Sequence, residues 1–378
     1  MTASDTPLSL PEIAEPLLAW YDANKRDLPW RTDPTPYRVW ISEIMLQQTR
    51  VEAVKPYFSR FLSALPDVYA LAACPPDTLH KLWEGLGYYS RVRNLQRAAE
   101  LIVRDLGGVI PSDPAALKKL PGIGSYTAGA IAAFAYGVPA PAVDGNVLRV
   151  LARLTADGRN ILDPCVKRDY EAAVAAALPK DRPGDFGQAL IEVGATVCGP
   201  NTAPDCSVCP LSPVCRACLD GLTDTLPHKE KKKARRVEPR TVLLVTDGTR
   251  YLIHRRPDTG LLASLFEFPA LAGHADAAEV ESYLTSCGLS PHEIRRCGDA
   301  KHIFTHLEWH MISYRVSLAP GSLPSFLPFF LEAGKAPTPS PAGDCFFVTP
   351  AEMRDSYPLP SAFSAFRQEI FSEKGIPC

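Results

Sequence analysis

The sequence lacks the long apolar runs of a membrane protein. No stretch of about 18 apolar residues occurs along the chain, so no membrane-spanning helix is expected. The opening residues, MTASDTPLSLPEIAEPLL, contain no basic segment followed by an apolar one, so no secretory signal is expected either. Together these two absences predict a protein of the cytosol that has no membrane partner.

The chain also lacks an excess of charge of either sign. Its 40 Lys and Arg residues nearly balance 42 Asp and Glu residues, and the net charge of -2 gives no hint of a nucleic-acid partner. A whole-chain sum can hide a basic face, so this balance excludes little. The 378 residues, 46% of them hydrophobic, are many for a single core, and we expect two globular domains.

Strand-like alternation is missing from the first part of the chain. Apolar residues recur at helical spacing from about Ile13 to Leu222, which predicts an all-α domain over residues 8–222. The basic stretch LPHKEKKKARRVEPR then lies in a predicted solvated linker over residues 223–240, where it could also contact phosphates.

The residue pattern changes from helical to strand-like after this linker. RTVLLVT and RYLIHRR flank Asp247-Gly248, which is a strong hairpin signal, and WHMISYRVSL predicts a further strand. We therefore expect an α+β domain over residues 241–378. A Pro-rich stretch at 319–344 interrupts it and is predicted to be a surface insertion.

The eleven cysteines are bunched and odd in number, which argues against a disulfide framework. Four of them follow the pattern C-x7-C-x2-C-x5-C: Cys198, Cys206, Cys209 and Cys215. No histidine lies between His80 and His228, so a metal centre in the loop 198–215 would have sulfur ligands only. Such a centre is expected to hold structure, and the spacing fits zinc and an iron–sulfur cluster equally.

A glycine-containing turn joins two predicted helices in LPGIGSYTAGAI. Gly122 and Gly124 permit positive φ angles and close backbone approach, and the amides at the start of the next helix form a phosphate site that needs no charged side chain. A helix C-cap would explain one such glycine without a ligand. Further on, Asp144 stands just ahead of another helix, where an N-cap is the simplest role for it.

The helix VWISEIMLQQTRV carries one acid, Glu43, among apolar neighbours. A carboxylate at such a position lies either on a solvated helix face or where water is scarce. In the second case desolvation raises its pKa, and the group can hold and deliver a proton.

These features, in this order, resemble the helix-hairpin-helix DNA glycosylase superfamily, and in particular its MutY-type family of adenine glycosylases. The resemblance covers roughly residues 10–315 and the C-terminal end. It is carried by RDLPWR, WISEIMLQQTRV, LWEGLGYYSRVRNL, LPGIGSYTAGAI, AVDGNVLRV, the cysteine cluster, GLLASLFEFP and HIFTHLEW. It implies a multidomain fold, with a six-helix-barrel glycosylase domain that carries an Fe–S loop and a Nudix-like C-terminal domain.

The resemblance implies that the chain removes adenine paired with 8-oxoguanine, and also adenine paired with G, by hydrolysing the N-glycosidic bond. Glu43 would protonate the leaving base and then activate water, and an ionised Asp144 would stabilise the sugar cation. Asn146 would position water or Asp144. Tyr126 stands where bifunctional relatives such as endonuclease III have the Schiff-base lysine, so a monofunctional enzyme is expected. Helix packing is the alternative role for this tyrosine.

The family's substrate contacts carry over to named positions in this sequence. The adenine pocket would be formed by Trp30, Arg31, Leu46 and Gln188. The residues expected at DNA are the stack-inserting Gln48 and Tyr88, the hairpin's Gly122, Gly124 and Ser125, and the phosphate-contacting Arg91. Core packing is the alternative for Tyr88, although its loop follows two glycines.

The second domain departs from its family in two ways. The glutamate-rich magnesium helix of Nudix hydrolases is reduced to Glu279 and Glu281, so we expect binding without hydrolysis. The loop that reads 8-oxoguanine through Phe-Ser-His is Phe304-Thr305-His306 here, in which threonine keeps the hydroxyl. A strand end with a packed aromatic is the alternative for Phe304 and Thr305.

The resemblance also implies a [4Fe–4S] cluster on Cys198, Cys206, Cys209 and Cys215. Seven residues separate the first two cysteines where the family has six, and Cys218 is an alternative fourth ligand. The expected partner is double-stranded DNA containing A opposite 8-oxoguanine. The expected state is a monomer in the bacterial cytosol and nucleoid.

Two other functions compete with this one. A bifunctional pyrimidine glycosylase and lyase is disfavoured by Tyr126 and by the second domain. A catalytically silent DNA-binding module is disfavoured by the presence of both Glu43 and Asp144.

Overall fold

The computed structural model describes residues 10, 12–200, 203–230, 234–319, 329–330, 338–339 and 345–373. The chain forms two compact units. The first comprises Met1–Cys74 and Arg93–Lys232, and the second comprises Pro75–Val92 and Lys233–Cys378. In the part of the chain described, no helix has the length and apolar character required to cross a membrane.

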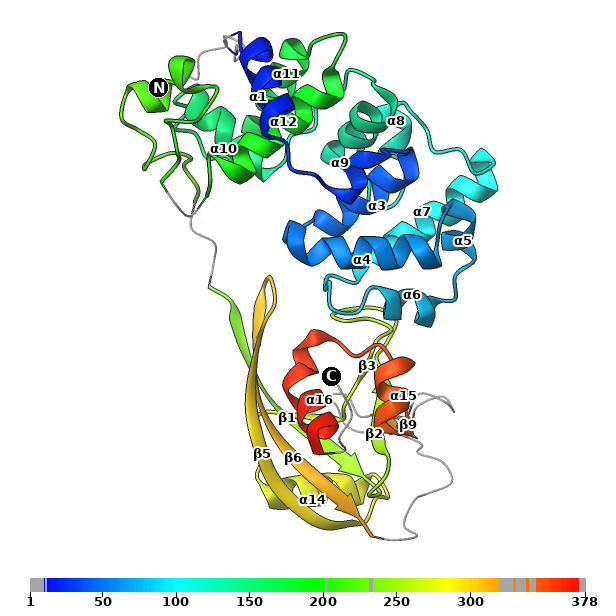
Figure 1. The fold of residues 1–378 in the computed structure, drawn as a ribbon. Helices are drawn as coiled ribbons and strands as arrows, with labels where there is room; N and C mark the ends of the chain where they lie inside the picture. Colours follow the sequence, from blue (N-terminus) through cyan, green and yellow to red (C-terminus); the bar gives the residue numbers. More distant parts are fainter. Residues whose placement is uncertain are drawn as a thin grey trace. The chain divides into compact units, whose positions relative to one another are not determined.

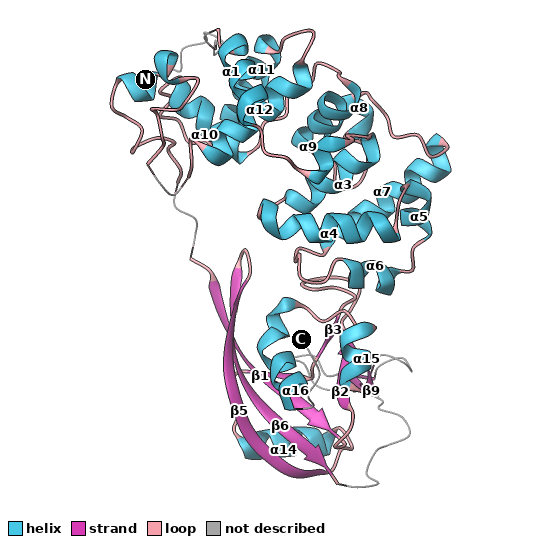
Figure 2. Cartoon of the chain, viewed as in Figure 1, coloured by secondary structure: helices cyan, strands magenta, loops and turns pink. Residues whose placement is uncertain are grey.

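The first unit is helical, and its described residues contain no strand (Figures 1 and 2). Its helices are α1 (Ala14–Asn24), α2 (Pro29–Thr32), α3 (Pro36–Leu46), α4 (Val51–Ala64), α5 (Val68–Ala73), α8 (Pro114–Leu117), α9 (Ser125–Ala130), the π-helix η1 (Ile131–Ala135), α10 (Gly145–Leu154), α11 (Pro164–Ala177), α12 (Pro183–Thr196), the 3-10 helix η2 (Ser212–Val214) and α13 (Arg216–Leu219). Helix α7 (Ser90–Leu106) begins in the second unit and continues into the first.

A buried cluster joins α1, α10 and α12 in this unit. Leu17 of α1, Val147 and Leu151 of α10, and Phe186 and Leu190 of α12 are all fully buried in it. The apolar side chains of α10 recur every three to four positions, which places them on one helix face. This packing fixes the N-terminus of α10 beside α12.

Local sequence signals begin the helices that carry the candidate site. Thr35 caps α3 by accepting a hydrogen bond from the Arg38 amide, and Pro36 takes the first helical position. Asp144 caps α10 by accepting from the amides of Asn146 and Val147. The predicted N-cap role of Asp144 is therefore confirmed.

The second unit contains α6 and all the described strands. Its elements are α6 (Pro76–Leu82), β1 (Arg236–Thr246), β2 (Tyr251–Arg255), β3 (Phe266–Glu267), β4 (Ala270–Ala272), α14 (Ala277–Ser286), β5 (Pro291–Ile303), β6 (Leu307–Leu318), β7 (Phe329–Phe330), β8 (Thr338–Pro339), β9 (Cys345–Val348), α15 (Pro350–Asp355), the 3-10 helix η3 (Ser361–Phe363) and α16 (Ser364–Glu373).

The main sheet has the strand order β3-β2-β1-β6-β5, with β4 paired to β1 and β9 to β2. β1 and β6 are parallel, whereas β1–β2 and β5–β6 are antiparallel. Alternate residues of β1 enter different cores: Val242 and Leu244 on one face, Leu243 and Val245 on the other. Figure 1 shows α16 on one side of the long strands and α14 on the other. The sheet is thus covered on both faces.

Most sequence expectations for this unit are confirmed. The hairpin at Asp247-Gly248 joins β1 and β2, and WHMISYRVSL forms most of β6. The prediction that residues 223–240 form only a linker is wrong at its end, because β1 already begins at Arg236 and pairs with β6. The predicted insertion 319–344 lies largely outside the described residues. Within it, β7 and β8 pair with each other.

Candidate active site

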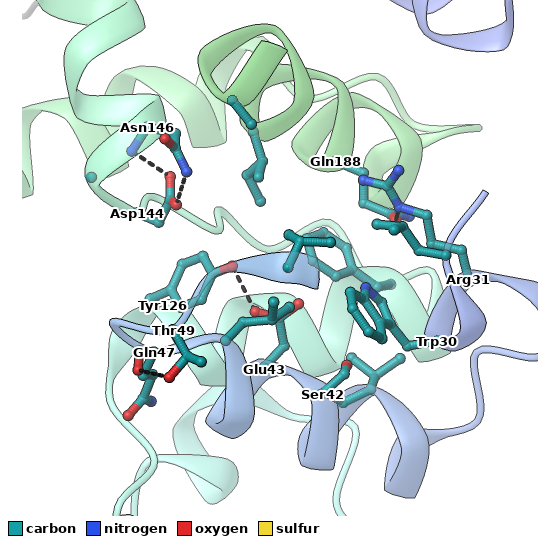
Figure 3. A pocket seen from close by; sticks show the side chains of 18 of the residues that line it. Trp30, Arg31, Ser42, Glu43, Gln47, Thr49, Tyr126, Asp144, Asn146 and Gln188 are labelled. Carbon is teal, nitrogen blue, oxygen red and sulfur yellow. Dashed lines mark hydrogen bonds between the residues drawn. The ribbon is translucent and has the colours of Figure 1, made fainter. Parts of the chain in front are cut away.

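The helical unit contains a cavity of about 650 Å³. Residues of α2, α3, α9 and α12 line it, together with the turn that enters α10. Figure 3 shows Glu43 and Tyr126 pointing toward each other on one side of the cavity, Asp144 and Asn146 near the start of α10, and Trp30, Arg31 and Gln188 at the other end. The cavity collects side chains that lie far apart in the sequence.

Glu43 lies on the buried face of α3, with 6% of its surface exposed. The Tyr126 hydroxyl donates a 2.6 Å hydrogen bond to Glu43 Oε2. Burial raises the pKa of Glu43 to about 7, against the lowering effect of this hydrogen bond, and the nearby Asp144 charge adds to the increase. The expected raised pKa is therefore found. The pKa of Tyr126 is raised well above its usual value, mainly by burial, so this hydroxyl keeps its proton and donates.

Asp144 lies in the same cavity, and its oxygens accept bonds from two backbone amides and from Asn146 Nδ2, the last at 2.7 Å. Burial raises the pKa of Asp144 above its ordinary value, while these hydrogen bonds and the nearby Arg149 charge favour the ionised carboxylate that the sequence predicted. The capping contacts set the orientation of the carboxylate, and burial sets its pKa.

A chain of hydrogen bonds continues behind Asp144. Arg149 Nη2 donates to Asn146 Oδ1 at 3.0 Å, and Arg149 Nε donates to the Cys198 carbonyl at 2.7 Å. The backbone of Gly194 lies against Asn146, because a Cβ built on this glycine would stand 2.7 Å from Asn146 Cβ. Asn146 is held from both sides, and it in turn holds Asp144.

The predicted pocket residues Trp30, Arg31, Leu46 and Gln188 all line the cavity. Trp30 is buried and packs edge-on against Phe58 at a centroid distance of 5.5 Å. Arg31 Nε donates to Gln188 Oε1 at 3.1 Å. This end of the cavity therefore offers an aromatic wall and a fixed amide.

The hairpin residues differ from one another in backbone conformation and in their contacts. Gly122 adopts φ +76°, and a Cβ there would stand 2.8 Å from Asn94 Cβ, so this position needs glycine. Gly124 is extended and caps α9, so the positive φ that its sequence allows is not used. Ser125 donates to Glu171 at 2.8 Å. Gln48 lines the cavity and adopts φ 57°, which is uncommon for a residue with a side chain.

In the second unit, Tyr88 is 46% exposed whereas Tyr89 is buried. The exposed position predicted for Tyr88 is confirmed. The prediction that Arg91 contacts phosphates is contradicted: Arg91 is buried and donates through Nη2 to the carbonyls of Leu86 and Gly87. Burial lowers the pKa of Arg91 to about 10. Through these hydrogen bonds Arg91 supports the backbone of the loop that carries Tyr88.

The turn between β5 and β6 presents Thr305 and His306 to solvent, while Phe304 is half-buried and packs edge-on against Trp309 at 4.7 Å. The packed aromatic that we considered for Phe304 is therefore present. The Thr305 hydroxyl donates to the Tyr88 hydroxyl at 3.4 Å, and both residues belong to the second unit. In α14, Glu279 forms a capping box with Asp276, so this acid has a local structural role.

The clustered cysteines line one small pocket together with Arg153: Cys198, Cys206, Cys209, Cys215 and Cys218. Among the described residues, no three His, Cys, Asp or Glu side chains stand in a metal-binding arrangement. The donor set nevertheless fits a thiolate-bound group, because it consists of sulfur only and Arg153 Nη1 lies 3.1 Å from Cys198 Sγ.

Sequence reasoning gave no role to Arg26, Lys167 or Glu192. Arg26 and Lys167 line the cavity, and Glu192 joins Arg26 to Arg31 through hydrogen bonds. One signal for Glu192 was present in FGQALIEVG, where it follows Gln188 by four positions and so shares its helix face.

Comparisons with known proteins agree with this geometry. The HhH-GPD superfamily of base excision DNA repair proteins matches residues 41–174, and a NUDIX domain matches residues 241–369. A solved thermostable thymine-DNA glycosylase aligns with a TM-score of 0.50 and 28% identity, covering 55% of this chain and 95% of that one. The fold and the match define a base excision DNA glycosylase with an added Nudix-like domain.

Curated relatives give the particular family. Adenine DNA glycosylase of Mus musculus is 36% identical over 366 residues, covering 81% of this chain and 71% of that protein. Adenine DNA glycosylase of Buchnera aphidicola subsp. Baizongia pistaciae (strain Bp) is 33% identical over 295 residues, covering 77% and 82%. The chain belongs to the adenine DNA glycosylase family, and the family resemblance predicted from the sequence is confirmed.

Proposed function

We propose that this enzyme removes adenine paired with 8-oxoguanine, and adenine paired with guanine as a secondary substrate, without cutting the DNA strand. The observation that carries the proposal is the pair of carboxyl groups in one cavity, with Glu43 buried and its pKa raised to about 7. A group with this pKa holds a proton near neutral pH and also releases it, as general acid–base catalysis requires.

The chemistry needs two carboxyl groups with different tasks. Glu43 protonates the departing adenine, and its conjugate base then activates the water that attacks the sugar. Asp144 is held by Asn146 and by the amides of α10, and it stabilises the positive charge that develops on the sugar. That positive charge favours the ionised form of Asp144 at the moment of reaction, although burial opposes ionisation in the free enzyme.

Two observations support a monofunctional reaction. Tyr126, at the position where bifunctional relatives have lysine, is engaged with Glu43 and has no amine for a Schiff base. Among the described residues that line the cavity, the only lysine is Lys167, which lies 3.8 Å from Glu171 as an ion pair. Lys167 is therefore the residue to remove when strand cleavage is tested.

The target adenine must leave the duplex to reach this cavity. Trp30, Leu46, Arg31 and Gln188 would enclose the flipped base. The other predicted DNA contacts follow the family: Gln48 and Tyr88 enter the base stack, and the amides around Gly122, Gly124 and Ser125 meet phosphate.

The second unit supports recognition of the opposite base. The exposed Thr305 and His306 offer hydrogen-bonding groups at the tip of the β5–β6 turn. 8-Oxoguanine differs from guanine by a donor at N7 and an acceptor at C8, and a hydroxyl pairs with either. We propose that one monomer acts on one lesion, in the compartment that holds the DNA, the bacterial cytosol and nucleoid.

The cysteine pocket would hold a [4Fe–4S] cluster through Cys198, Cys206, Cys209 and Cys215. Such a cluster would crosslink the loop after α12, because it would join cysteines at both ends of a segment with little secondary structure. The proton transfers above belong to Glu43 and do not depend on the cluster.

The test is incubation with duplexes that carry A opposite 8-oxoguanine or A opposite G, scoring free adenine and, before alkali, strand breaks. We expect adenine release with intact strands, faster opposite 8-oxoguanine. Glu43→Gln and Asp144→Asn should each abolish release while DNA binding persists.

Other outcomes separate the competing functions. Breaks through a borohydride-trapped adduct that disappears in Lys167→Ala would establish a lyase. Tight binding without any product would establish a silent binding module.

A further inference from the structure

A buried ion network stands behind the adenine end of the cavity. Glu192 is 0% exposed and accepts from Arg26 Nε at 2.6 Å, from Arg26 Nη2 and the Arg26 amide at 3.1 Å, and from Arg31 Nη2 at 2.7 Å. Arg26 and Arg31 are among the described residues that line the cavity, and Glu192 is not. It takes no part in the proton transfer proposed above.

The network ends on the amide of Gln188. Arg31 holds Glu192 with Nη2, the Arg26 carbonyl with Nη1 at 3.1 Å, and Gln188 Oε1 with Nε at 3.1 Å. A guanidinium has only donors, so the amide oxygen must face Arg31 and the amide nitrogen must face elsewhere. Figure 3 shows the Arg31 and Gln188 side chains in contact at the cavity edge.

A fully buried carboxylate without a partner would be unstable, and the positive charges of Arg26 and Arg31 compensate the negative charge of Glu192. Burial on its own raises the pKa of Glu192, but the hydrogen bonds from Arg26 and Arg31 outweigh it and hold the pKa at about 2. Glu192 is therefore an anion near neutral pH, where it holds Arg31.

We infer that Glu192 is a positioning residue for base selection, which holds Arg31 so that the Gln188 amide keeps the one orientation that matches adenine. This inference rests on the proposed function. An amide pairs with adenine by accepting from the exocyclic amine and donating to a neighbouring ring nitrogen. An amide rotated by half a turn offers the same two groups in reverse order and loses both bonds.

Hypoxanthine separates this role from a general loss of structure, because it has a carbonyl where adenine has its amine. The fixed amide places oxygen against that carbonyl and excludes it, whereas the rotated amide donates to it. Loss of the ion pair between Glu192 and Arg31 should therefore slow adenine excision more than hypoxanthine excision. A good bidentate pair is worth about 1–3 kcal/mol, which corresponds to a fall in the adenine-to-hypoxanthine rate ratio of about 5- to 150-fold.

The experiment measures single-turnover excision of adenine and of hypoxanthine, each opposite 8-oxoguanine, by the full-length enzyme and by Glu192→Gln. This variant keeps the shape of the side chain and removes its charge. Asp185→Asn is the matched control, since it breaks another carboxylate–arginine pair on the same helix, with Arg182. We expect the ratio to fall in Glu192→Gln and to stay unchanged in the control.

The outcomes are distinct. If both rates fall by the same factor in Glu192→Gln, the residue is merely structural and the inference is overturned. If Glu192→Gln does not fold, Glu192→Asp, which keeps the charge but retracts it by one methylene, is scored by the same ratio, and an unchanged ratio overturns the inference. Failure of the unsubstituted enzyme to release adenine would instead overturn the proposed function.

Discussion

At the scale of single residues, environment rather than residue type separates the two acids of the cavity. Desolvation raises the pKa values of both carboxyls, although Glu43 is buried and Asp144 is partly exposed. Glu43 receives a hydrogen bond from one neutral phenol, whereas Asp144 receives two from the backbone and one from Asn146. The second set of donors fixes an anion in place, and the first leaves a proton available.

The pKa of Glu43 predicts the pH dependence of adenine release. Only the protonated form donates to the base, so the single-turnover rate should be constant below about pH 7 and fall above it by about tenfold per pH unit. The measurement is the adenine release rate from saturated complexes between pH 5.5 and 9. A rate that rises through this range would contradict the assignment of Glu43 as the acid.

Replacing Tyr126 by phenylalanine should move this pH profile. The Tyr126 hydrogen bond lowers the pKa of Glu43, so its removal raises that pKa further and shifts the fall in rate to higher pH. Tyr136→Phe is the matched control, because Tyr136 hydrogen-bonds the Ile110 carbonyl and does not line the cavity among the described residues. A profile shifted to lower pH in Tyr126→Phe would disprove the interaction.

At the scale of elements, the loop between α6 and α7 is supported by Arg91. Its Nη2 donates to the carbonyls of Leu86 and Gly87, and its guanidinium lies over the rings of Trp83 and Tyr88, at 5.3 and 5.6 Å from their centroids. The loop contains the positive-φ residues Gly85, Gly87 and Tyr88. Such a backbone needs internal bonds to keep one shape.

Arg91→Ala should therefore lower the free energy of unfolding by about 1–3 kcal/mol, because buried carbonyls lose their donor. Arg97→Ala, which removes an exposed arginine of α7, should change it by no more than about 0.5 kcal/mol. Urea unfolding measures both. Equal, small effects would mean that Arg91 is not a support for the loop.

Periodicity and capping signals were enough to predict the helices and strands. They were not enough to predict the contacts and burial of individual polar side chains. The spacing of apolar residues predicted the helices around Asp144 and the strand β6, because these patterns are local. An arginine beside a glycine-rich loop has the same sequence signature whether it faces phosphate or a carbonyl, so Arg91 was misassigned. The raised pKa of Asp144 could not be predicted from the local pattern, because its desolvation comes from a cavity whose residues lie far apart in the sequence.

At the scale of the whole molecule, each unit has a hydrophobic core of its own. The first is built around α1, α10 and α12, and the second has two cores on opposite faces of its sheet. Because the cores share no residues, we expect two unfolding transitions rather than one.

Single core substitutions should separate these transitions. Leu190→Ala, in the helical core, should lower the stability of one transition by about 2–5 kcal/mol, and Phe363→Ala, in the sheet core, should lower the other by about 3–5 kcal/mol. Calorimetry of each variant beside the unsubstituted protein makes the assignment. A single transition that moves as one in both variants would mean that the units unfold together.

The tight packing of Gly194 against Asn146 has a consequence for inherited or selected variants. Even an added methyl group at this position must displace the neighbour that orients Asp144. Gly194 does not line the cavity among the described residues, so a ranking of harmful substitutions by distance from bound substrate would overlook it. A variant carrying alanine there should release adenine more slowly while it still folds and binds DNA, and comparing single-turnover release with DNA affinity checks this.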